Sequence, residues 1–266
     1  MTEIEALILG VIQGLTEFLP VSSSGHLQIA SSIFGTEANE NLLFTILVHG
    51  ATVLSTVVVF WKEIIKIIKG LFAFQWNDET KFTLNIAISI IPVGVVGVLF
   101  EKEIETFFNN QITFVAGMLS ITAILLAATH FLKSRNNTGD INPTKAFTVG
   151  LAQAFAILPG ISRSGATIAT ALILGVDKEK ATRFSFLMVI VPILGATLLK
   201  AIDFVKTPAS STAISGLSLS IGFISAFLVG VVACKWMVSL VKKGKLLYFA
   251  IYCFAVSFFV LVYQII

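Results

Sequence analysis

The chain has 266 residues, 56% of them hydrophobic and only 12% charged, with a mean hydropathy of +0.94 and a net charge of +3. Soluble domains carry about 25% charged residues, so this composition excludes an ordinary soluble protein and predicts a polytopic membrane protein. We expect no nucleic-acid partner. Cys234 and Cys253 fall within or beside apolar runs, where packing is expected rather than a disulfide or a metal site.

The first apolar segment, residues 6–34, is interrupted by the polar stretch "QGLTEFLPVSSSGH". Pro20 breaks a helix because it lacks an amide proton, and the serines and glycine after it favour a turn. At membrane depth, non-helical backbone is tolerated only where protein buries it or a wet cavity adjoins it. We therefore predict a re-entrant helix–loop–helix hairpin, with a kinked full span as the alternative. No basic residue precedes Lys62, so a cleaved signal peptide is not expected.

Six uninterrupted runs are long enough to cross about 30 Å of hydrocarbon as helices. Three of them follow the first broken segment. The other three follow a second broken segment, residues 146–176, in which Pro159 interrupts the helix as Pro20 does in the first. The predicted spans are 42–61, 83–100, 112–132, 184–201, 213–234 and 246–266.

The two broken segments resemble each other at a constant offset of 140 residues. The matching residues are Gly10, Gln13, Ser22, Ser24, Gly25 and Phe44 in the first half, and Gly150, Gln153, Ser162, Ser164, Gly165 and Phe184 in the second. Three spans per half is an odd number, so the second half would enter the membrane from the opposite face. We predict an inverted-topology repeat of about 1–132 and about 145–266 in one membrane domain, 1–266, with the two loops converging near the midplane.

The basic residues lie on alternate loops of this predicted all-α fold. Fifteen of the eighteen share one side, namely Lys62, Lys66, Lys69, Lys81, Lys133, Arg135, Lys145, Arg163, Lys178, Lys180, Arg183, Lys235, Lys242, Lys243 and Lys245. By the positive-inside rule that side is cytoplasmic, so both termini are predicted outside.

Ionisable residues at membrane depth are costly and therefore indicate a functional site. The first loop supplies Glu17, Ser22, Ser23, Ser24 and His26, and the second supplies Ser162, Arg163, Ser164 and Thr167. Arg163 between two hydroxyl residues predicts an anion cradle, because a guanidinium fork matches phosphate oxygens. The alternative is that Arg163 only pairs with Glu17 and locks the loops together.

The first loop also combines a nucleophile, a base and a carboxylate within a few residues. Gln13 and Glu17 are four residues apart, so on a helix they share one face. His49, in the middle of the first span, is expected either to support the site or to pack in the core.

The stretches "QGLTEFLPVSSSGH" and "LPGISRSGAT" resemble the two signature motifs of the bacterial undecaprenyl-diphosphate phosphatase family, the bacitracin-resistance phosphatases. The resemblance covers essentially the whole chain, including "FTILVHGATVLSTVVVFWK" and "KATRFSFLMVIVPILGA". It implies hydrolysis of undecaprenyl diphosphate to undecaprenyl phosphate and phosphate in the bacterial cytoplasmic membrane, at a site open to the outer face. This reaction recycles the lipid carrier of peptidoglycan synthesis, and bacitracin would compete by binding the substrate.

The resemblance also implies residue roles. Glu17 is similar to the family's essential acidic residue, and Gln13 takes its Glu-or-Gln position. Ser23 and His26 match its candidate nucleophile and acid/base residues, and Arg163 matches its phosphate-binding arginine. The remaining residues of the two motifs, expected to bind the substrate phosphates, are Ser22, Ser24, Ser162, Ser164 and Thr167.

The resemblance further implies a divalent cation, Mg²⁺ or Ca²⁺. Because Gln13 is uncharged, a metal site built from two carboxylates of the first motif is in doubt. A hard cation would have to rely on Glu17, substrate phosphates and water.

Three questions stay open: the catalytic groups, the class of function and the oligomeric state. Ser23, His26 or water could attack the phosphorus, and Glu17 or His26 could take the proton. The inverted repeat is also typical of transporters, so a lipid-phosphate flippase, with or without hydrolysis, is the alternative function. Small residues such as Gly94 and Gly97, or Gly216 and Gly222, could pack helices within the chain or in a homodimer.

Overall fold

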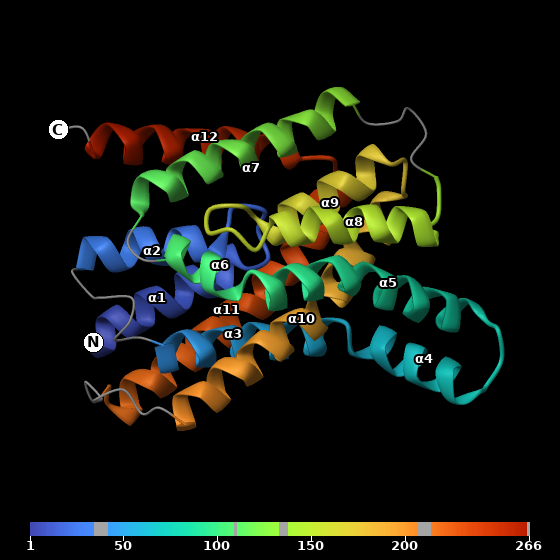
Figure 1. Cartoon of the computed structure of the whole chain (residues 1–266), viewed down its shortest axis with the longest axis horizontal. Coiled ribbons are helices and arrows are strands. Elements are labelled where there is room, and N and C mark those ends of the chain that lie inside the picture. The colour runs from blue at the N-terminus through green and yellow to red at the C-terminus, as the bar shows by residue number, and fades with distance from the viewer. Residues whose placement is uncertain (35–41, 109–110, 133–137, 207–213, 265–266) are drawn as a thin grey trace.

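The computed structural model describes residues 1–34, 42–108, 111–132, 138–206 and 214–264. These residues form helices joined by short turns, with no β-strand in the described ranges and one isolated bridge between Gly139 and Val176 (Figure 1). The helices are α1 (Glu3–Thr16), α2 (Ser23–Phe34), α3 (Leu42–Val59), α4 (Trp61–Phe72), α5 (Asp78–Leu99), α6 (Glu101–Phe108), α7 (Ile112–Leu132), α8 (Pro143–Phe155), α9 (Arg163–Ile173), α10 (Lys178–Lys206), α11 (Gly216–Lys242) and α12 (Leu246–Tyr263).

Five of these helices, α5, α7, α10, α11 and α12, are long and apolar enough to cross a membrane. Helix α3 meets the same criterion only together with α4, which is bent away from it by 75°. The six predicted spans overlap α3, α5, α7, α10, α11 and α12, although residue 213 of the fifth and residues 265–266 of the last lie outside the described residues. The first span ends at Val59 rather than residue 61 because the chain bends at Phe60. The fold is therefore all-helical and fits a multi-pass membrane protein.

Helix α4 was not predicted, because its lysines were expected to lie in a loop. Lys62, Lys66 and Lys69 are spaced so that they share one face of an amphipathic helix. Glu63 of α4 forms an ion pair with Arg183 of α10 at 2.7 Å, and Lys66 pairs with Glu79 of α5 at 3.0 Å. These contacts fix the bend after α3.

The two broken segments each form a helix pair, α1 with α2 and α8 with α9. Figure 1 shows that the outer ends of α1 and α2 lie at the end of the molecule that holds both termini. The outer ends of α8 and α9 lie at the opposite end, beside α4 and α5. The turns of the two pairs meet inside the molecule, where the Cβ of a residue replacing Gly25 would lie 3.2 Å from the Cα of Gly160.

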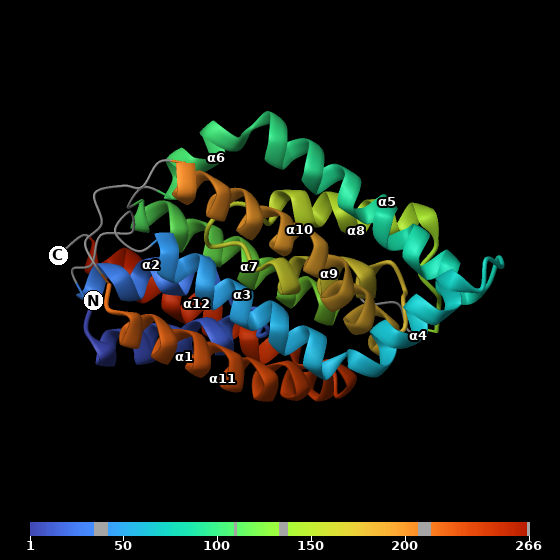
Figure 2. The same cartoon turned by 90° about the horizontal axis from the view of Figure 1, so that it is seen from below.

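The first helix of each broken segment packs on a helix from the other half of the chain. Helix α1 packs most extensively on α11, and α8 packs on α5; Figure 2 shows α1 alongside α11. The matched glycines Gly10 and Gly150 lie at these crossings. A Cβ at Gly10 would lie 2.6 Å from the carbonyl oxygen of Gly222, and one at Gly150 would lie 2.3 Å from that of Ser89. Only glycine allows the backbones to approach so closely.

Candidate active site

The two turns are built by the same capping arrangement. In each, a serine Oγ accepts a hydrogen bond from the amide three residues later and lies 3.3 Å from the Oγ of the serine two residues later. The first turn uses Ser22, Gly25 and Ser24, and the second uses Ser162, Gly165 and Ser164. The offset of 140 residues therefore corresponds to a repeated local structure.

Both turns require backbone conformations that few residues adopt. Gly160 has φ +98°, which favours glycine, and Ser22 has φ +69°, a sparsely populated region for a residue with a side chain. Thr122 of α7 holds the second turn, since its Oγ1 donates to the Gly160 carbonyl and accepts from the Ser162 amide, both at 3.0 Å. This role of Thr122 could not be predicted from the sequence, because a threonine within a span usually forms its hydrogen bond within its own helix.

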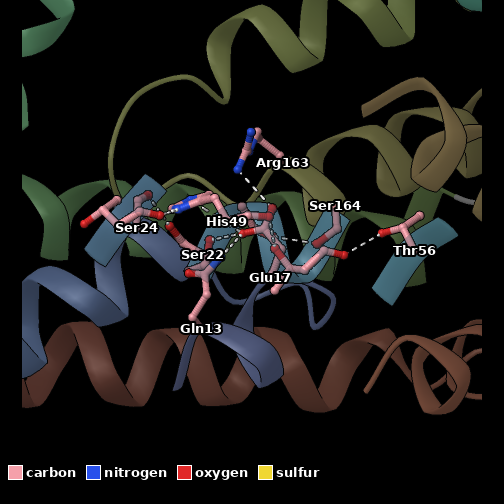
Figure 3. Close-up of polar contacts among 12 residues, drawn as sticks. Gln13, Glu17, Ser22, Ser24, His49, Thr56, Arg163 and Ser164 are labelled. Carbon is pink, nitrogen blue, oxygen red and sulfur yellow. Dashed lines mark hydrogen bonds and ion pairs between the residues drawn. The ribbon is translucent and has the colours of Figure 1, made fainter. Parts of the chain in front are cut away.

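The side chain of Glu17 is the centre of the site (Figure 3). Its Oε1 accepts a hydrogen bond from Arg163 at 3.0 Å, across 146 positions in sequence. Its Oε2 accepts from Ser23 Oγ at 2.6 Å and from Gln13 Nε2 at 3.0 Å. The Glu17 side chain is 8% exposed and that of Arg163 27%, so the carboxylate is buried while the guanidinium reaches an opening. The structure thus brings the two predicted loops together at one ion pair.

Three further sequence-predicted residues lie near this pair. His49 of α3 has its Nε2 4.0 Å from Glu17 Oε2, while its Nδ1 lies 2.9 Å from the Thr45 carbonyl oxygen. Thr167 of α9 donates to the Arg163 carbonyl at 2.9 Å and so supports the first turn of that helix. Ser164 Oγ donates to the Leu19 carbonyl at 3.4 Å, a second link between the turns.

His26 faces a different neighbour. Its Nδ1 lies 2.9 Å from the Ser22 carbonyl oxygen, and its Nε2 lies 2.9 Å from the hydroxyl of Tyr252 on α12. The two rings are nearly parallel, with an interplanar angle of 11° and centroids 5.6 Å apart. His26 is therefore engaged with α12 rather than with the Glu17 carboxylate. Tyr252 was missed from the sequence because it is 226 positions from His26.

Two pockets adjoin the ion pair, and both are lined by Glu17 and Arg163. The first, which we call the serine pocket, is otherwise lined mainly by Ser22, Ser23, Ser24 and Ser162. The second, the α3–α10 pocket, lies between those two helices and is lined by Thr52, Thr56 and Ser185 together with apolar side chains of α10. The serine pocket is therefore mainly polar in its lining, and the α3–α10 pocket has a mixed polar and apolar lining.

The donor set for a metal is small. The described part of the chain holds no group of three or more His, Cys, Asp or Glu side chains placed to share an ion. Beside Glu17, however, the Oε1 atom of Gln13 is buried and has no hydrogen-bond partner among the described residues. A carboxylate and an amide oxygen are hard donors of the kind that Mg²⁺ and Ca²⁺ take, with substrate phosphates and water completing the set.

A sequence model described as "Bacitracin resistance protein BacA" matches residues 6–259, and these limits enclose both turns. The chain belongs to this family. A relative from Parabacteroides distasonis, named undecaprenyl-diphosphatase, is 57% identical over 253 residues that cover 95% of each chain. A relative of the same name from Bacteroides thetaiotaomicron is 54% identical over 265 residues, which is 100% of each chain. One from Salinibacter ruber is 40% identical over 97% of each chain.

Family membership confirms the resemblance inferred from the two motifs. In this family member, the first motif supplies the carboxylate and the Ser23 hydroxyl, and the second supplies Arg163. The motifs are therefore the two halves of a single site.

Proposed function

We propose that this protein is an integral-membrane phosphatase that hydrolyses undecaprenyl diphosphate to undecaprenyl phosphate and inorganic phosphate. The observation that carries the proposal is the shared carboxylate: Glu17 binds both the Ser23 hydroxyl and the Arg163 guanidinium. A serine beside a base and a cation that can hold phosphate oxygens are the parts that phosphoryl transfer needs. The product would return to the cell as the lipid carrier for peptidoglycan synthesis.

In the first step, the terminal phosphoryl group enters the serine pocket, and its oxygens bind the Arg163 guanidinium in place of the Glu17 carboxylate. Ser23 Oγ attacks the phosphorus, the bond from phosphorus to the bridging oxygen breaks, and undecaprenyl phosphate leaves with the bonding electrons. The Ser23 proton passes to Glu17 Oε2, which lies 2.6 Å from the attacking oxygen. Because such catalysis is mainly positioning and charge stabilisation, Arg163 and the serine hydroxyls contribute by holding the equatorial oxygens.

In the second step, water attacks the phosphoserine. Glu17 returns its proton to Ser23 Oγ as the bond from phosphorus to that oxygen breaks, and both protons of the water remain on the released phosphate. The serine hydroxyl and the Glu17 carboxylate are then restored. Glu17 is favoured over His26 as the base because its oxygen contacts Ser23, whereas His26 contacts Tyr252.

We propose further that Glu17 and the unpartnered Gln13 Oε1 hold a divalent cation, Mg²⁺ or Ca²⁺, when substrate is bound. Such an ion supplies charge neutralisation for the phosphates. Equilibrium dialysis with Mn²⁺ as a probe, in the presence of a prenyl phosphonate, tests this assignment. We expect binding by wild type and at least tenfold weaker binding by Gln13→Leu. Equal binding by both would refute the Gln13 contact.

The proposed topology is six spans, including α3, and two re-entrant hairpins arranged as an inverted repeat of about 1–132 and about 145–266. It is supported by the pairs α1–α2 and α8–α9, whose outer ends lie at opposite ends of the molecule, and by the packing of α1 and α8 on helices of the other half. Lys133 and Arg135 lie outside the described residues, but α4 and the start of α10 carry other lysines at the end away from the termini. We therefore propose that both termini and the site opening face the outside of the cytoplasmic membrane. Labelling of Thr2→Cys from outside, and of Gln75→Cys only after permeabilisation, is the expected result.

Two partner assignments are also proposals. Bacitracin would compete by sequestering the diphosphate substrate rather than by binding the protein. A homodimer could form through Gly94 and Gly97, which have no atoms within 4 Å of an added Cβ, whereas Gly222 is packed against Phe44 of the same chain. Loss of a crosslinked dimer in the Gly94→Leu variant would support that interface, and an unchanged dimer would refute it.

Phosphate release from undecaprenyl diphosphate by the purified protein tests the main proposal. We expect turnover by wild type and its loss in Arg163→Ala. A well-folded wild-type protein that binds the lipid but releases no phosphate would refute hydrolysis and leave the transporter alternative.

A further inference from the structure

Ser185 is a buried hydroxyl in the α3–α10 pocket that the reaction above does not use. It lies on α10, is 2% exposed, and its Oγ has no hydrogen-bond partner among the described residues. It lines the same pocket as Glu17 and Arg163. Leaving a buried hydroxyl without a partner is unfavourable, so its proton is available for a ligand that enters this pocket.

The threonines around it differ in this respect. Thr52 donates to the His49 carbonyl at 2.9 Å, Thr56 donates to the Thr52 carbonyl at 3.1 Å, and Thr167 donates to the Arg163 carbonyl. Each of these hydroxyls uses its proton on the backbone of its own helix. Ser185 therefore combines with Arg163 as a potential donor to an anion in this pocket.

The position of the α3–α10 pocket relative to the serine pocket suits the leaving group of the reaction. Figure 3 shows Ser22 and Ser24, which line the serine pocket, on one side of Glu17, and Thr56, which lines the α3–α10 pocket, on the other. An in-line displacement places the leaving oxygen opposite the attacking oxygen. With the terminal phosphoryl beside Ser23, the inner phosphate and its prenyl chain would extend towards Ser185.

The wall beyond Ser185 fits a prenyl chain. Phe186, Val189, Ile190 and Ile193 line the pocket, and their spacing of three, four and seven residues places them on one face of α10. A hydroxyl and a guanidinium at the start of an apolar stripe match the chemistry of a phosphate joined to a hydrocarbon.

We propose that the α3–α10 pocket is the leaving-group subsite, in which Ser185 donates a hydrogen bond to the inner, prenyl-bearing phosphate while the first isoprene units lie along Phe186 and Ile190. This inference rests on the proposed function and adds a substrate-binding residue to it. It explains why the chain keeps an unpartnered hydroxyl beside the ion pair.

Inhibition constants test the role of Ser185 in the full-length protein turning over farnesyl diphosphate. Farnesyl monophosphate carries the inner phosphate and the chain, whereas inorganic phosphate mimics the terminal group. For Ser185→Ala we expect inhibition by farnesyl monophosphate to weaken about tenfold, the scale of a hydrogen bond to a charged group, and inhibition by inorganic phosphate to change less than twofold. Ser185→Thr keeps the hydroxyl and should stay within about threefold of wild type.

Thr148→Ala is the matched control, since Thr148 is a half-buried threonine on α8, remote in the sequence from both pockets' lining residues, whose hydroxyl donates to the Thr144 carbonyl. It should change neither constant. An unchanged farnesyl monophosphate constant in Ser185→Ala, or an equal change in both constants, would overturn the subsite. If wild type itself releases no phosphate, the proposed function fails, and this inference fails with it.

A measurement on the wild-type chain covers the case in which Ser185→Ala does not fold. A farnesyl monophosphate analogue with a diazirine on its first isoprene unit should crosslink to the part of α10 from Phe186 to Ile193. Crosslinks confined to α2 or α12 would place the chain elsewhere and overturn the proposal.

Discussion

The two turns share one capping arrangement of hydrogen bonds and carry different side chains at the position after the cap. Ser23 and Arg163 are 140 residues apart, so each directly follows the capping serine of its turn. In one turn that position supplies a hydroxyl, and in the other it supplies a cation, and both contact Glu17. A repeated capping element with two different side chains at one position therefore brings a hydroxyl and a guanidinium to one carboxylate, from helix pairs whose outer ends lie at opposite ends of the molecule.

The segments that lead into the two turns also differ in the side chains or contacts at matching positions. Gln13 donates to Glu17, whereas the matched Gln153 is buried with both amide atoms lacking a hydrogen-bond partner in the described structure. The position matching Glu17 is Ile157, so the second half has the amide without the carboxylate. Of these two matched positions only that of the first half is acidic, so the base proposed above, Glu17, has no counterpart in the second half.

The largest effect is expected at the attacking position. Ser23→Ala removes the nucleophile but leaves the cradle, so kcat should fall by about four orders of magnitude, on the scale of nucleophile removal in other hydrolases. Ser24→Ala, which changes a hydroxyl in the same pocket, is the control and should lose at most about tenfold. Phosphate-release kinetics measure both. Similar losses in the two variants would contradict a nucleophilic role for Ser23.

The matching position in the second turn should give the next largest effect. Arg163→Ala should cost about 2–4 kcal/mol of transition-state stabilisation, or roughly 10²–10³ in kcat/KM, comparable with loss of an oxyanion donor. Arg163→Lys should recover part of this because it keeps the charge and loses the fork. Turnover near that of wild type in Arg163→Ala would show that the arginine only locks the loops.

The two glutamines provide a matched pair of substitutions. Gln13→Leu should lower kcat/KM about tenfold, because Glu17 loses a charge-assisted hydrogen bond. Gln153→Leu should leave activity within twofold and raise the free energy of unfolding by about 1 kcal/mol, since it removes a buried amide without partners. Steady-state kinetics and denaturant unfolding in detergent measure the two quantities. Equal activity losses would show that both halves contribute to the base chemistry.

The smallest effect is expected at the His26 contact. Tyr252→Phe removes one hydrogen bond of about 1 kcal/mol while keeping the ring, so kcat should fall less than threefold if His26 only positions its turn. His26→Gln should then cost no more than about tenfold. A loss of a thousandfold in His26→Gln would instead identify His26 as an acid or base in the reaction.

Much of this arrangement could be predicted from the sequence. Pro20 and Pro159 marked the helix breaks, and the constant offset marked two copies of one turn, because both features depend on residues close together in the chain. The Glu17–Arg163 contact followed from the expected convergence of the two loops, since a buried charge needs a partner.

The remaining features depend on contacts that the sequence does not encode locally. Helix α4 was missed because its lysines appeared as loop charges until the fold placed Glu79 and Arg183 beside it. The orientation of His26 is set by Tyr252 on α12, and the second turn is held by Thr122 on α7. Such partners come from distant parts of the chain, and only tertiary packing selects them.

The most direct test follows labelled phosphate from the terminal position of a prenyl diphosphate onto the protein. Rapid quenching and peptide mapping should find the label on Ser23 in wild type and on the same residue in Arg163→Ala, where it should form about 10²–10³ times more slowly. Label on His26, equal rates in the two proteins, or phosphate release without any labelled residue would contradict a centre in which one turn attacks and the other holds the phosphate.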